Sequence, residues 1–367
     1  MTKKLTPQEL ETYSRQIVLD DIGYDGQLKL RQAKVCLIGV GGLGSVSALQ
    51  LTAMGIGYLR LVDRDIVSRS DLHRQYLYDV ESLGLAKVEV ACQKLSRLNP
   101  DVRLDPIPEA LNSTNAGDLM AGMDAVIDGL DRPEPRYIIN RTCLKLKIPY
   151  VFGSAIEAFG NASTMLPGQT FCLECFMPGL KDEDLPSCGV VGVHPSIVGV
   201  IASIQVSEAV RLITGRKPKL FNKLLYADLR QMEFTLLDIQ ASDSCKICGS
   251  KPAGPPEKVA DKYFEETCAR DGRRTFILSP KERLEIDIGR LKEIIKNQEL
   301  QIKKEGKLGI AWEKSSYITA SILKSGIMIV QTAAHIGPDI KDEIFKTYRS
   351  ILVDGLGVPD YILPDKT

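Results

Sequence analysis

Short apolar runs alternate with amphipathic stretches along the first two-thirds of the chain. Residues 34–38 and 58–62 are apolar runs whose β-branched and bulky members are typical of buried parallel strands. Between them, residues 45–54 repeat apolar positions at helical spacing. A strand, a helix and a second strand in this order predict a βαβ unit, the building block of a doubly wound α/β sheet.

The same alternation continues beyond this unit, and residues 5–32 before it have a polar helical pattern. We expect further strands at 102–107, 125–131 and 150–156, helices at 87–98, 113–120, 134–146 and 195–214, and antiparallel strands at 159–166, 224–229 and 232–237. These elements predict a Rossmann-like, doubly wound α/β sheet with an antiparallel extension.

The pattern changes after a Pro- and Gly-rich segment at 250–257, which has the composition of a linker. We expect strands at 275–278, 308–312, 317–323 and 327–332, with helices at 288–295 and 340–352. The predicted organisation is therefore a domain at 1–249, a linker at 250–257 and a small α+β domain at 258–367.

Composition narrows the class of protein. Lys+Arg and Asp+Glu both number 47, so no overall field favours nucleic acid or a membrane surface as a partner. No apolar segment follows the N-terminus, and we expect a cytoplasmic protein. The apolar stretch at 195–213 is interrupted by Gln205, Glu208 and Arg211, which favours a buried helix over a membrane span.

The turn after the first strand carries the clearest binding signal. Its sequence, Gly39 to Gly44, has glycine at the first, third and sixth positions, and Asp63 ends the second strand about twenty residues on. In this context glycines let the backbone approach a phosphate, and the carboxylate meets a ribose hydroxyl. NAD is one ligand with these needs. Arg74 and Lys87 nearby favour ATP, because cations neutralise a triphosphate.

Nine cysteines include two widely separated Cys-x-x-Cys pairs, Cys172 with Cys175 and Cys245 with Cys248. Four thiolates complete a tetrahedral Zn²⁺ site with no open position, which is a structural site. Two unrelated pairs or one redox pair are the alternatives. Cys188 lies in a Pro/Gly-rich loop outside both pairs, and from its position a nucleophilic and a structural role are equally well supported.

Taken together and in order, these residues resemble the ubiquitin-activating superfamily of E1-like enzymes, in particular its compact archaeal and bacterial adenylyltransferases. The resemblance covers about residues 5–250. It is carried by Tyr13–Gln16, the loop from Gly39 to Gly44, Asp63 with Asp65, Leu72 with Arg74 and Gln75, Ala86 with Lys87, Asp131 with Arg136, the two Cys-x-x-Cys pairs, and Cys188 with Gly192.

The resemblance implies that the chain uses ATP and Mg²⁺ to adenylate the C-terminal glycine of a ubiquitin-like protein ending in Gly-Gly. Asp131 would bind Mg²⁺, and Arg15 would reach the other site of a homodimer. It also assigns Zn²⁺ to the four paired cysteines and a thioester or acyl-disulfide to Cys188. The implied nucleotide-binding residues are Gly39, Gly41, Gly42, Gly44, Asp63, Asp65, Asp71, Arg74, Gln75, Lys87 and Arg132.

Two of these positions depart from the family pattern, because Asp71 and Arg132 stand where asparagine is usual. The first adds negative charge beside the phosphates and the second adds positive charge. Their contact with nucleotide is therefore an open question at this point.

Residues 258–367 have no counterpart in the shortest members of the superfamily. By analogy with larger activating enzymes they would dock a conjugating enzyme or the modifier, and a dimer-stabilising appendage is an equal alternative. For the whole chain, activation of a ubiquitin-like modifier through Cys188 is the main hypothesis. The alternatives are adenylation of a ubiquitin-fold sulfur carrier for tRNA, molybdopterin or thiamine, an NAD-dependent oxidoreductase, and an inactive scaffold.

Overall fold

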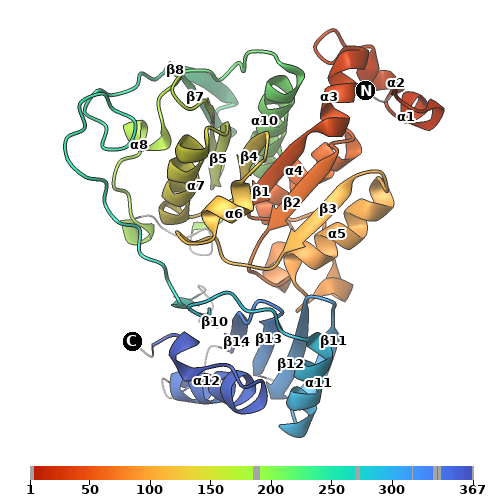
Figure 1. Cartoon of the computed structure of the whole chain (residues 1–367), viewed down its shortest axis with the longest axis vertical. Coiled ribbons are helices and arrows are strands. Elements are labelled where there is room, and N and C mark those ends of the chain that lie inside the picture. Colours follow the sequence, from red (N-terminus) through yellow and green to blue (C-terminus); the bar gives the residue numbers. More distant parts are fainter. Residues whose placement is uncertain are drawn as a thin grey trace.

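The computed structural model describes residues 4–184, 191–268, 273–315, 317–333, 337 and 340–365. Two β-sheets dominate it, one of eight strands and one of six. Figure 1 shows the smaller sheet lying below the strand ends of the larger one, with the N-terminal helices at the opposite end of the molecule.

The larger sheet has the strand order β3-β2-β1-β4-β5-β6-β7-β8. Its first five strands are parallel, and the last three are antiparallel. The strands are β1 (Lys34–Ile38), β2 (Tyr58–Val62), β3 (Arg103–Ile107), β4 (Ala125–Asp128), β5 (Tyr150–Ile156), β6 (Phe159–Met165), β7 (Lys223–Asp228) and β8 (Glu233–Asp238). The strand order reverses at β1, which makes its carboxyl end the usual ligand crevice of such sheets.

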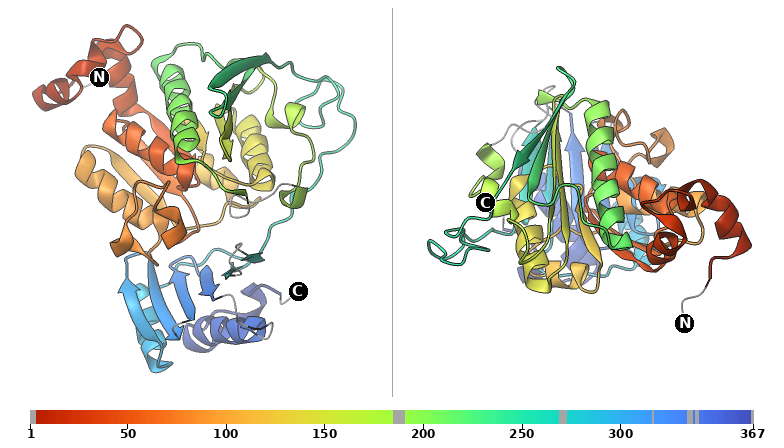
Figure 2. Two further views of the ribbon diagram at one scale, coloured as in Figure 1. Left: turned by 180° about the vertical axis from the view of Figure 1, so that it is seen from behind. Right: turned by 90° about the horizontal axis from the view of Figure 1, so that it is seen from above.

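Helices cover both faces of this sheet, as Figure 2 shows from above. Apolar side chains of α3 (Gly23–Gln32), α4 (Gly42–Ala53), α5 (Lys87–Leu98) and α10 (Pro195–Thr214) pack with alternate residues of β1 and β2 on one face. On the other face lie α6 (Ala116–Met120), α7 (Pro133–Leu146) and α8 (Leu173–Phe176). The short helices α1 (Pro7–Thr12) and α2 (Ser14–Ile17) precede α3.

The long helix α10 is apolar enough, by length and composition alone, to cross a membrane. It instead packs along α4, β5 and β6, and two of its buried polar side chains form hydrogen bonds with the sheet. Gln205 donates to the carbonyl of Asp128, and Glu208 accepts from Thr164. The expectation of a buried helix is therefore confirmed.

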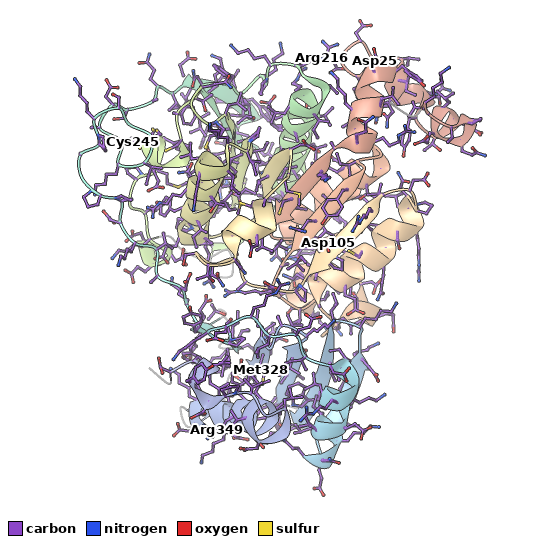
Figure 3. The ribbon with its side chains drawn as sticks, in the orientation of Figure 1. Asp25, Asp105, Arg216, Cys245, Met328 and Arg349 are labelled. Carbon is purple, nitrogen blue, oxygen red and sulfur yellow. The ribbon has the colours of Figure 1, made fainter. Side chains whose placement is uncertain are left out.

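The smaller sheet has the order β11-β12-β13-β14-β10-β9, and every pairing in it is antiparallel. Its strands are β9 (Phe264–Cys268), β10 (Arg274–Leu278), β11 (Gln301–Glu305), β12 (Gly309–Ser315), β13 (Ile318–Leu323) and β14 (Met328–Thr332). Helices α11 (Ile288–Asn297) and α12 (Ile340–Arg349) cover one face, and a single π-helical turn (Ser350–Gly355) follows α12. Figure 3 labels Met328, the first residue of β14.

The two faces of the smaller sheet serve different cores. Phe276 and Leu278 of β10 point into the cluster formed with α11 and α12. Ile277, between them, joins the core of the larger sheet, as does Ile329 of β14. Because successive strand residues point to opposite faces, the smaller sheet packs against the larger one through the face that carries Ile277 and Ile329.

Polar contacts reinforce this interface. The carboxylate of Glu89 on α5, which is 5% exposed, accepts from the backbone N–H groups of Lys307 (2.7 Å) and Leu308 (2.9 Å). Ser321 donates to the carbonyl of Gly84 at 2.9 Å. These bonds join segments more than two hundred residues apart.

All the strands that the sequence predicts are present, with ends shifted by a few residues. Two strands of the smaller sheet, β9 and β11, were not predicted, because β9 is rich in glutamate and β11 in lysine. Both lie at the edges of their sheet, where one side of a strand has no neighbour to bury it. Helix α12 is shorter than expected, because the chain changes to the π-helical turn at Ser350.

We predict that Glu89→Ala weakens the interface between the two sheets. The substitution leaves two backbone N–H groups without their acceptor, which costs about 2 kcal/mol. Amide hydrogen exchange at Lys307 and Leu308 should accelerate, and the urea midpoint should fall.

The matched control is Glu81→Gln, which removes an exposed ion pair to Lys304 on the same face (3.5 Å). Exposed ion pairs contribute little to the free energy of unfolding. Equal exchange rates in both variants would contradict the prediction.

Candidate functional site

A cavity of about 730 Å³ lies at the carboxyl ends of β1, β2 and β4. Residues of the larger sheet form one wall, and Ile277, Ile329 and Gln331 of the smaller sheet form part of the other. Its volume is typical of pockets that bind small ligands. The predicted ligand crevice of the doubly wound sheet is therefore bordered on one side by the second sheet.

Glycine at two positions of the first turn permits close packing. Gly39 has φ +88°, and a Cβ atom there would lie 2.8 Å from the Gly129 backbone. A Cβ atom at Gly44 would lie 1.9 Å from the Gly39 carbonyl oxygen. These two glycines bring the start of α4 close against the ends of β1 and β4.

Gly41 differs from them, because a Cβ atom there would meet nothing closer than the Gln75 amide at 3.8 Å. Gly41 and Gly42 both line the cavity, directly at the N-terminus of α4. Free N–H groups at a helix start favour an anion. The turn therefore leaves room for a phosphate where its backbone faces the cavity.

Asp63 follows β2 and lies beside this turn. Its carboxylate accepts from the N–H of Val40 (2.7 Å) and from that of Asp65 (2.7 Å), which fixes the carboxylate across the glycine turn. Burial, and next the carboxylate of Asp65, raise the pKa of Asp63 to about 6. Asp63 and Asp65 both line the cavity, where the resemblance places both of them.

Lys87 begins α5, and its ammonium group lies in the cavity wall with 6% of the side chain exposed. It lies 3.3 Å from Asp65 and 3.7 Å from Asp71. Burial alone would lower the pKa of Lys87, but the carboxylates of Asp65 and then Asp71 outweigh it and raise the pKa. Lys87 is therefore a fixed positive charge beside the glycine turn.

Asp71 organises the neighbouring residues. Its carboxylate accepts from the Gln75 amide (2.9 Å), from the Ser68 N–H (3.0 Å) and from Arg74 (3.3 Å). Arg74 also donates to the carbonyl of Ser70 at 2.7 Å. Asp71 thus holds the side chains of Gln75 and Arg74, and its negative charge also faces Lys87 at 3.7 Å.

Asp131 lies past the end of β4 and lines the same cavity as Asp63. A buried group orders the chain before it: the Asp128 carboxylate accepts from Tyr150 (2.7 Å) and pairs with Arg136 (3.0 Å). Asp128 also accepts from the N–H of Leu130 (2.8 Å). The Asp131 carboxylate forms no hydrogen bond or ion pair with any residue that the structure describes, so it is available to a cation.

Arg132 forms an ion pair with a residue that the sequence analysis did not identify. Arg132 and Arg64 both pair with Glu265 of β9, one guanidinium on each carboxylate oxygen. Glu265 lines the cavity and is 8% exposed at its side chain. Nothing near Glu265 in the chain marks it, because its two partners come from the ends of strands in the other sheet.

Two predicted residues are not placed in this cavity. Arg15 is exposed on α2, and it is not among the residues that line the cavity. Cys188 lies outside the described residues. The other predicted nucleotide-binding residues line the cavity, except Gly44, whose role is packing.

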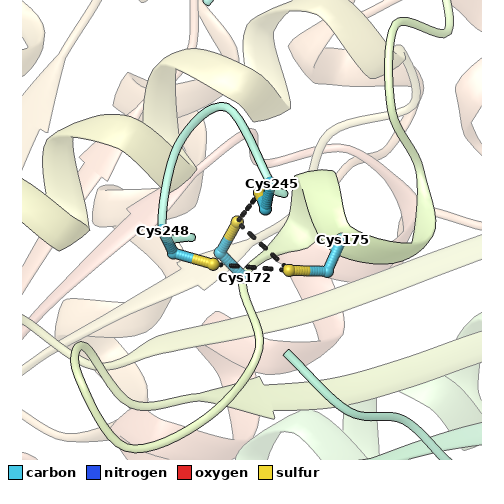
Figure 4. A group of neighbouring side chains, drawn as sticks. All are labelled: Cys172, Cys175, Cys245 and Cys248. Carbon is cyan, nitrogen blue, oxygen red and sulfur yellow. Dashed lines mark hydrogen bonds between the residues drawn. The ribbon is translucent and has the colours of Figure 1, made fainter. Parts of the chain in front are cut away.

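The two Cys-x-x-Cys pairs meet at the side of the larger sheet away from the smaller one, where Figure 3 labels Cys245. All four sulfur atoms lie within 4.8 Å of one another (Figure 4). The Sγ atoms of Cys172 and Cys245 are 3.7 Å apart, and those of Cys175 and Cys248 are 3.3 Å apart. A tetrahedral zinc with bonds of about 2.3 Å requires sulfur atoms roughly 3.8 Å apart. The donor set and its size therefore fit Zn²⁺.

Three further cysteines whose side chains the structure describes are poor candidates for a nucleophile. Cys36 and Cys143 are buried, and burial raises the pKa of the Cys36 thiol to about 12. Burial raises the pKa of the half-buried Cys92 to about 12 as well. A thiol that stays protonated is a poor nucleophile.

Comparison with known proteins gives a consistent picture. Residues 13–247 match the ThiF family. The SAMP-activating enzyme E1 of Haloferax volcanii is 33% identical over 270 residues, which is 73% of this chain and 98% of that protein. The adenylyltransferase and sulfurtransferase MOCS3 of Culex quinquefasciatus is 34% identical over 77% of this chain, and this chain spans 65% of that relative.

Solved structures share the fold. MccB of E. coli has a TM-score of 0.60 at 21% identity, over 68% of this chain and 75% of MccB. PaaA has a TM-score of 0.55 at 26% identity, over 66% of this chain and 77% of that one. Since the family match covers more than half of the chain and the named relatives are activating enzymes and adenylyltransferases, the chain belongs to the ThiF family of E1-like adenylyltransferases.

Proposed function

We propose that the protein uses ATP to adenylate the C-terminal carboxylate of a ubiquitin-like protein. The observation that carries this proposal is that Gly41, Lys87 and Asp131 line one cavity, although they come from three separate segments. A glycine turn, a buried cation and a free carboxylate are what a magnesium–nucleotide complex requires. The relative from Haloferax volcanii is named as an activating enzyme, which supports the same class of reaction.

In the proposed reaction, the carboxylate of the partner attacks the α-phosphorus of ATP. An acyl–phosphate bond forms, and the bond from the α-phosphorus to the bridging oxygen breaks, so that pyrophosphate leaves. Lys87 and Arg74 would hold phosphate oxygens and stabilise the charge that develops, while Asp63 would orient the ribose. This chemistry depends on positioning and charge neutralisation.

Asp131 fits a ligand of Mg²⁺, because its carboxylate faces the cavity and is uncommitted among the described residues. Mg²⁺ would bring positive charge to the phosphates of ATP. The four paired cysteines would hold Zn²⁺ in a closed site that joins the loop after β6 to the segment after β8. Such a site contributes to folding and leaves the chemistry to the nucleotide cavity.

For the fate of the adenylate, we favour transfer to Cys188. The thiolate would attack the acyl carbon, forming a thioester and releasing AMP, and a conjugating enzyme would then take the acyl group. Arg15 would act in the second site of a homodimer, which agrees with its exposed position on α2. Adenylation of a sulfur carrier is the second candidate, because the MOCS3 relatives are named as sulfurtransferases too.

We predict that Lys87→Ala lowers the rate of partner-dependent pyrophosphate exchange into ATP about a hundredfold or more. The reason is that a buried positive charge beside the phosphates is lost. Radiolabelled pyrophosphate incorporation with a Gly-Gly-ending candidate partner measures the effect. Lys94→Ala is the matched control, because Lys94 lies on the same helix and pairs with Asp79 at the surface. Full exchange activity in Lys87→Ala would rule out the proposed role.

We predict one zinc ion per chain, measured by elemental analysis of the purified protein. Cys172→Ser should lose the zinc and lower the unfolding temperature, because the metal ties two distant segments together. Cys92→Ser, which alters a thiol outside the cluster, should keep the zinc. Protein that is stable and metal-free would contradict the assignment.

We predict that Cys188→Ala still forms the adenylate but no longer forms an adduct with the partner that dithiothreitol cleaves. Non-reducing electrophoresis after incubation with ATP detects the adduct, and pyrophosphate exchange reports the first step separately. A thiol-sensitive adduct that persists in the variant would exclude Cys188 as the acceptor. Loss of both steps would show that the residue is needed before transfer.

A further inference from the structure

We propose that the C-terminal sheet completes the nucleotide site, with Glu265 as a positioning residue that holds Arg64 and Arg132 across the cavity. This inference rests on the proposed ATP-dependent function and deepens it. It gives residues 258–365 a task at the nucleotide, in place of docking a partner at a distance.

The position of the two arginines is the first argument. Arg64 follows β2 and Arg132 follows β4, and these strands flank β1 on either side. Their guanidinium groups meet at the two oxygens of Glu265. We call this group of Arg64, Glu265 and Arg132 the bridge. It spans the crevice at the end of β1, which leads into the glycine turn where the phosphates of a nucleotide would lie.

The cavity is the second argument. Its volume of about 730 Å³ is present while the bridge is formed, and it suffices for a nucleotide. Ile277 and Ile329 line the cavity from the second sheet, beside the bridge. The nucleotide can therefore bind with the C-terminal sheet in place, and the sheet supplies part of the wall around it.

Electrostatics supply the third argument. Without a carboxylate between them, two guanidinium groups this close would repel each other and turn toward solvent. Burial opposes ionisation of Glu265, but Arg64 and next Arg132 outweigh it and lower the pKa of Glu265. The carboxylate is thus charged at neutral pH. Among the described residues, Glu265 is the carboxylate that contacts both guanidinium groups, and Arg132 lies in addition 3.9 Å from Asp182.

The neighbouring residue shows that this placement is specific to position 265. Glu266 lies on the opposite face of β9 and pairs there with Arg274 (2.6 Å) and Lys341 (2.7 Å) within its own domain. Contacts away from the bridge, such as Glu89 with Lys307 and Ser321 with Gly84, hold the sheet against the first domain. Glu265 is therefore not the only link between the sheets, and its effect on nucleotide binding can be separated from docking.

The test compares Mg-ATP affinity, measured by calorimetry on the full chain, for the wild type and the variants Glu265→Gln, Glu266→Gln and Glu89→Ala. Glu265→Gln should bind Mg-ATP about tenfold more weakly, because the two arginines lose the group that aims them. Glu266→Gln should match the wild type. Glu89→Ala should weaken docking of the sheet while changing the ATP affinity by about twofold or less, since the remaining interface keeps the sheet seated.

Each outcome either supports or contradicts the role of Glu265. Equal affinity in Glu265→Gln and the wild type would overturn the inference and leave the proposed function intact. A loss of affinity in Glu89→Ala as large as in Glu265→Gln would also overturn it, because the effect would then follow docking alone. Wild-type protein that fails to bind Mg-ATP would contradict the proposed function together with the inference.

Discussion

The compensation of charge inside one crevice is the constraint on which the site depends. Four cations in the cavity wall are each held by at least one carboxylate: Lys87 by Asp65 and Asp71, Arg74 by Asp71, and Arg64 and Arg132 by Glu265. Buried cations are stable only when paired in this way. The pairing fixes the side chains before a ligand arrives, which reduces the free energy needed to order them on binding.

This arrangement explains the two departures from the family pattern. Asp71 accepts a hydrogen bond from Gln75 and pairs with Arg74 and Lys87. A negative residue at this position therefore fixes the side chains on the phosphate side of the cavity. Arg132 adds a positive charge that Glu265 partly balances from the second sheet. An arginine at 132 and a glutamate at 265 thus form one unit, and without the C-terminal sheet that arginine would keep only its longer contact with Asp182 (3.9 Å). Neither position therefore favours the alternative of an inactive scaffold.

How far the sequence predicts this structure depends on how each element is stabilised. The buried strands β1 and β2 and the helix α5 could be bounded closely, because apolar periodicity reflects burial directly. The glycine turn, Asp63 and the four cysteines could be identified because their chemistry depends on short spacings. Glu265 could not be identified, since its partners lie about 200 and 133 residues away and its strand is a polar edge. Only the folded chain brings these charges together.

The central claim is that this cavity binds ATP with Mg²⁺. The most direct measurement is calorimetric titration of the full chain with ATP in the presence and absence of Mg²⁺, and with NAD. The account predicts one Mg-ATP per chain, much weaker binding of ATP without the metal because carboxylates crowd the wall, and no binding of NAD. Tight binding of NAD with no binding of Mg-ATP would contradict it.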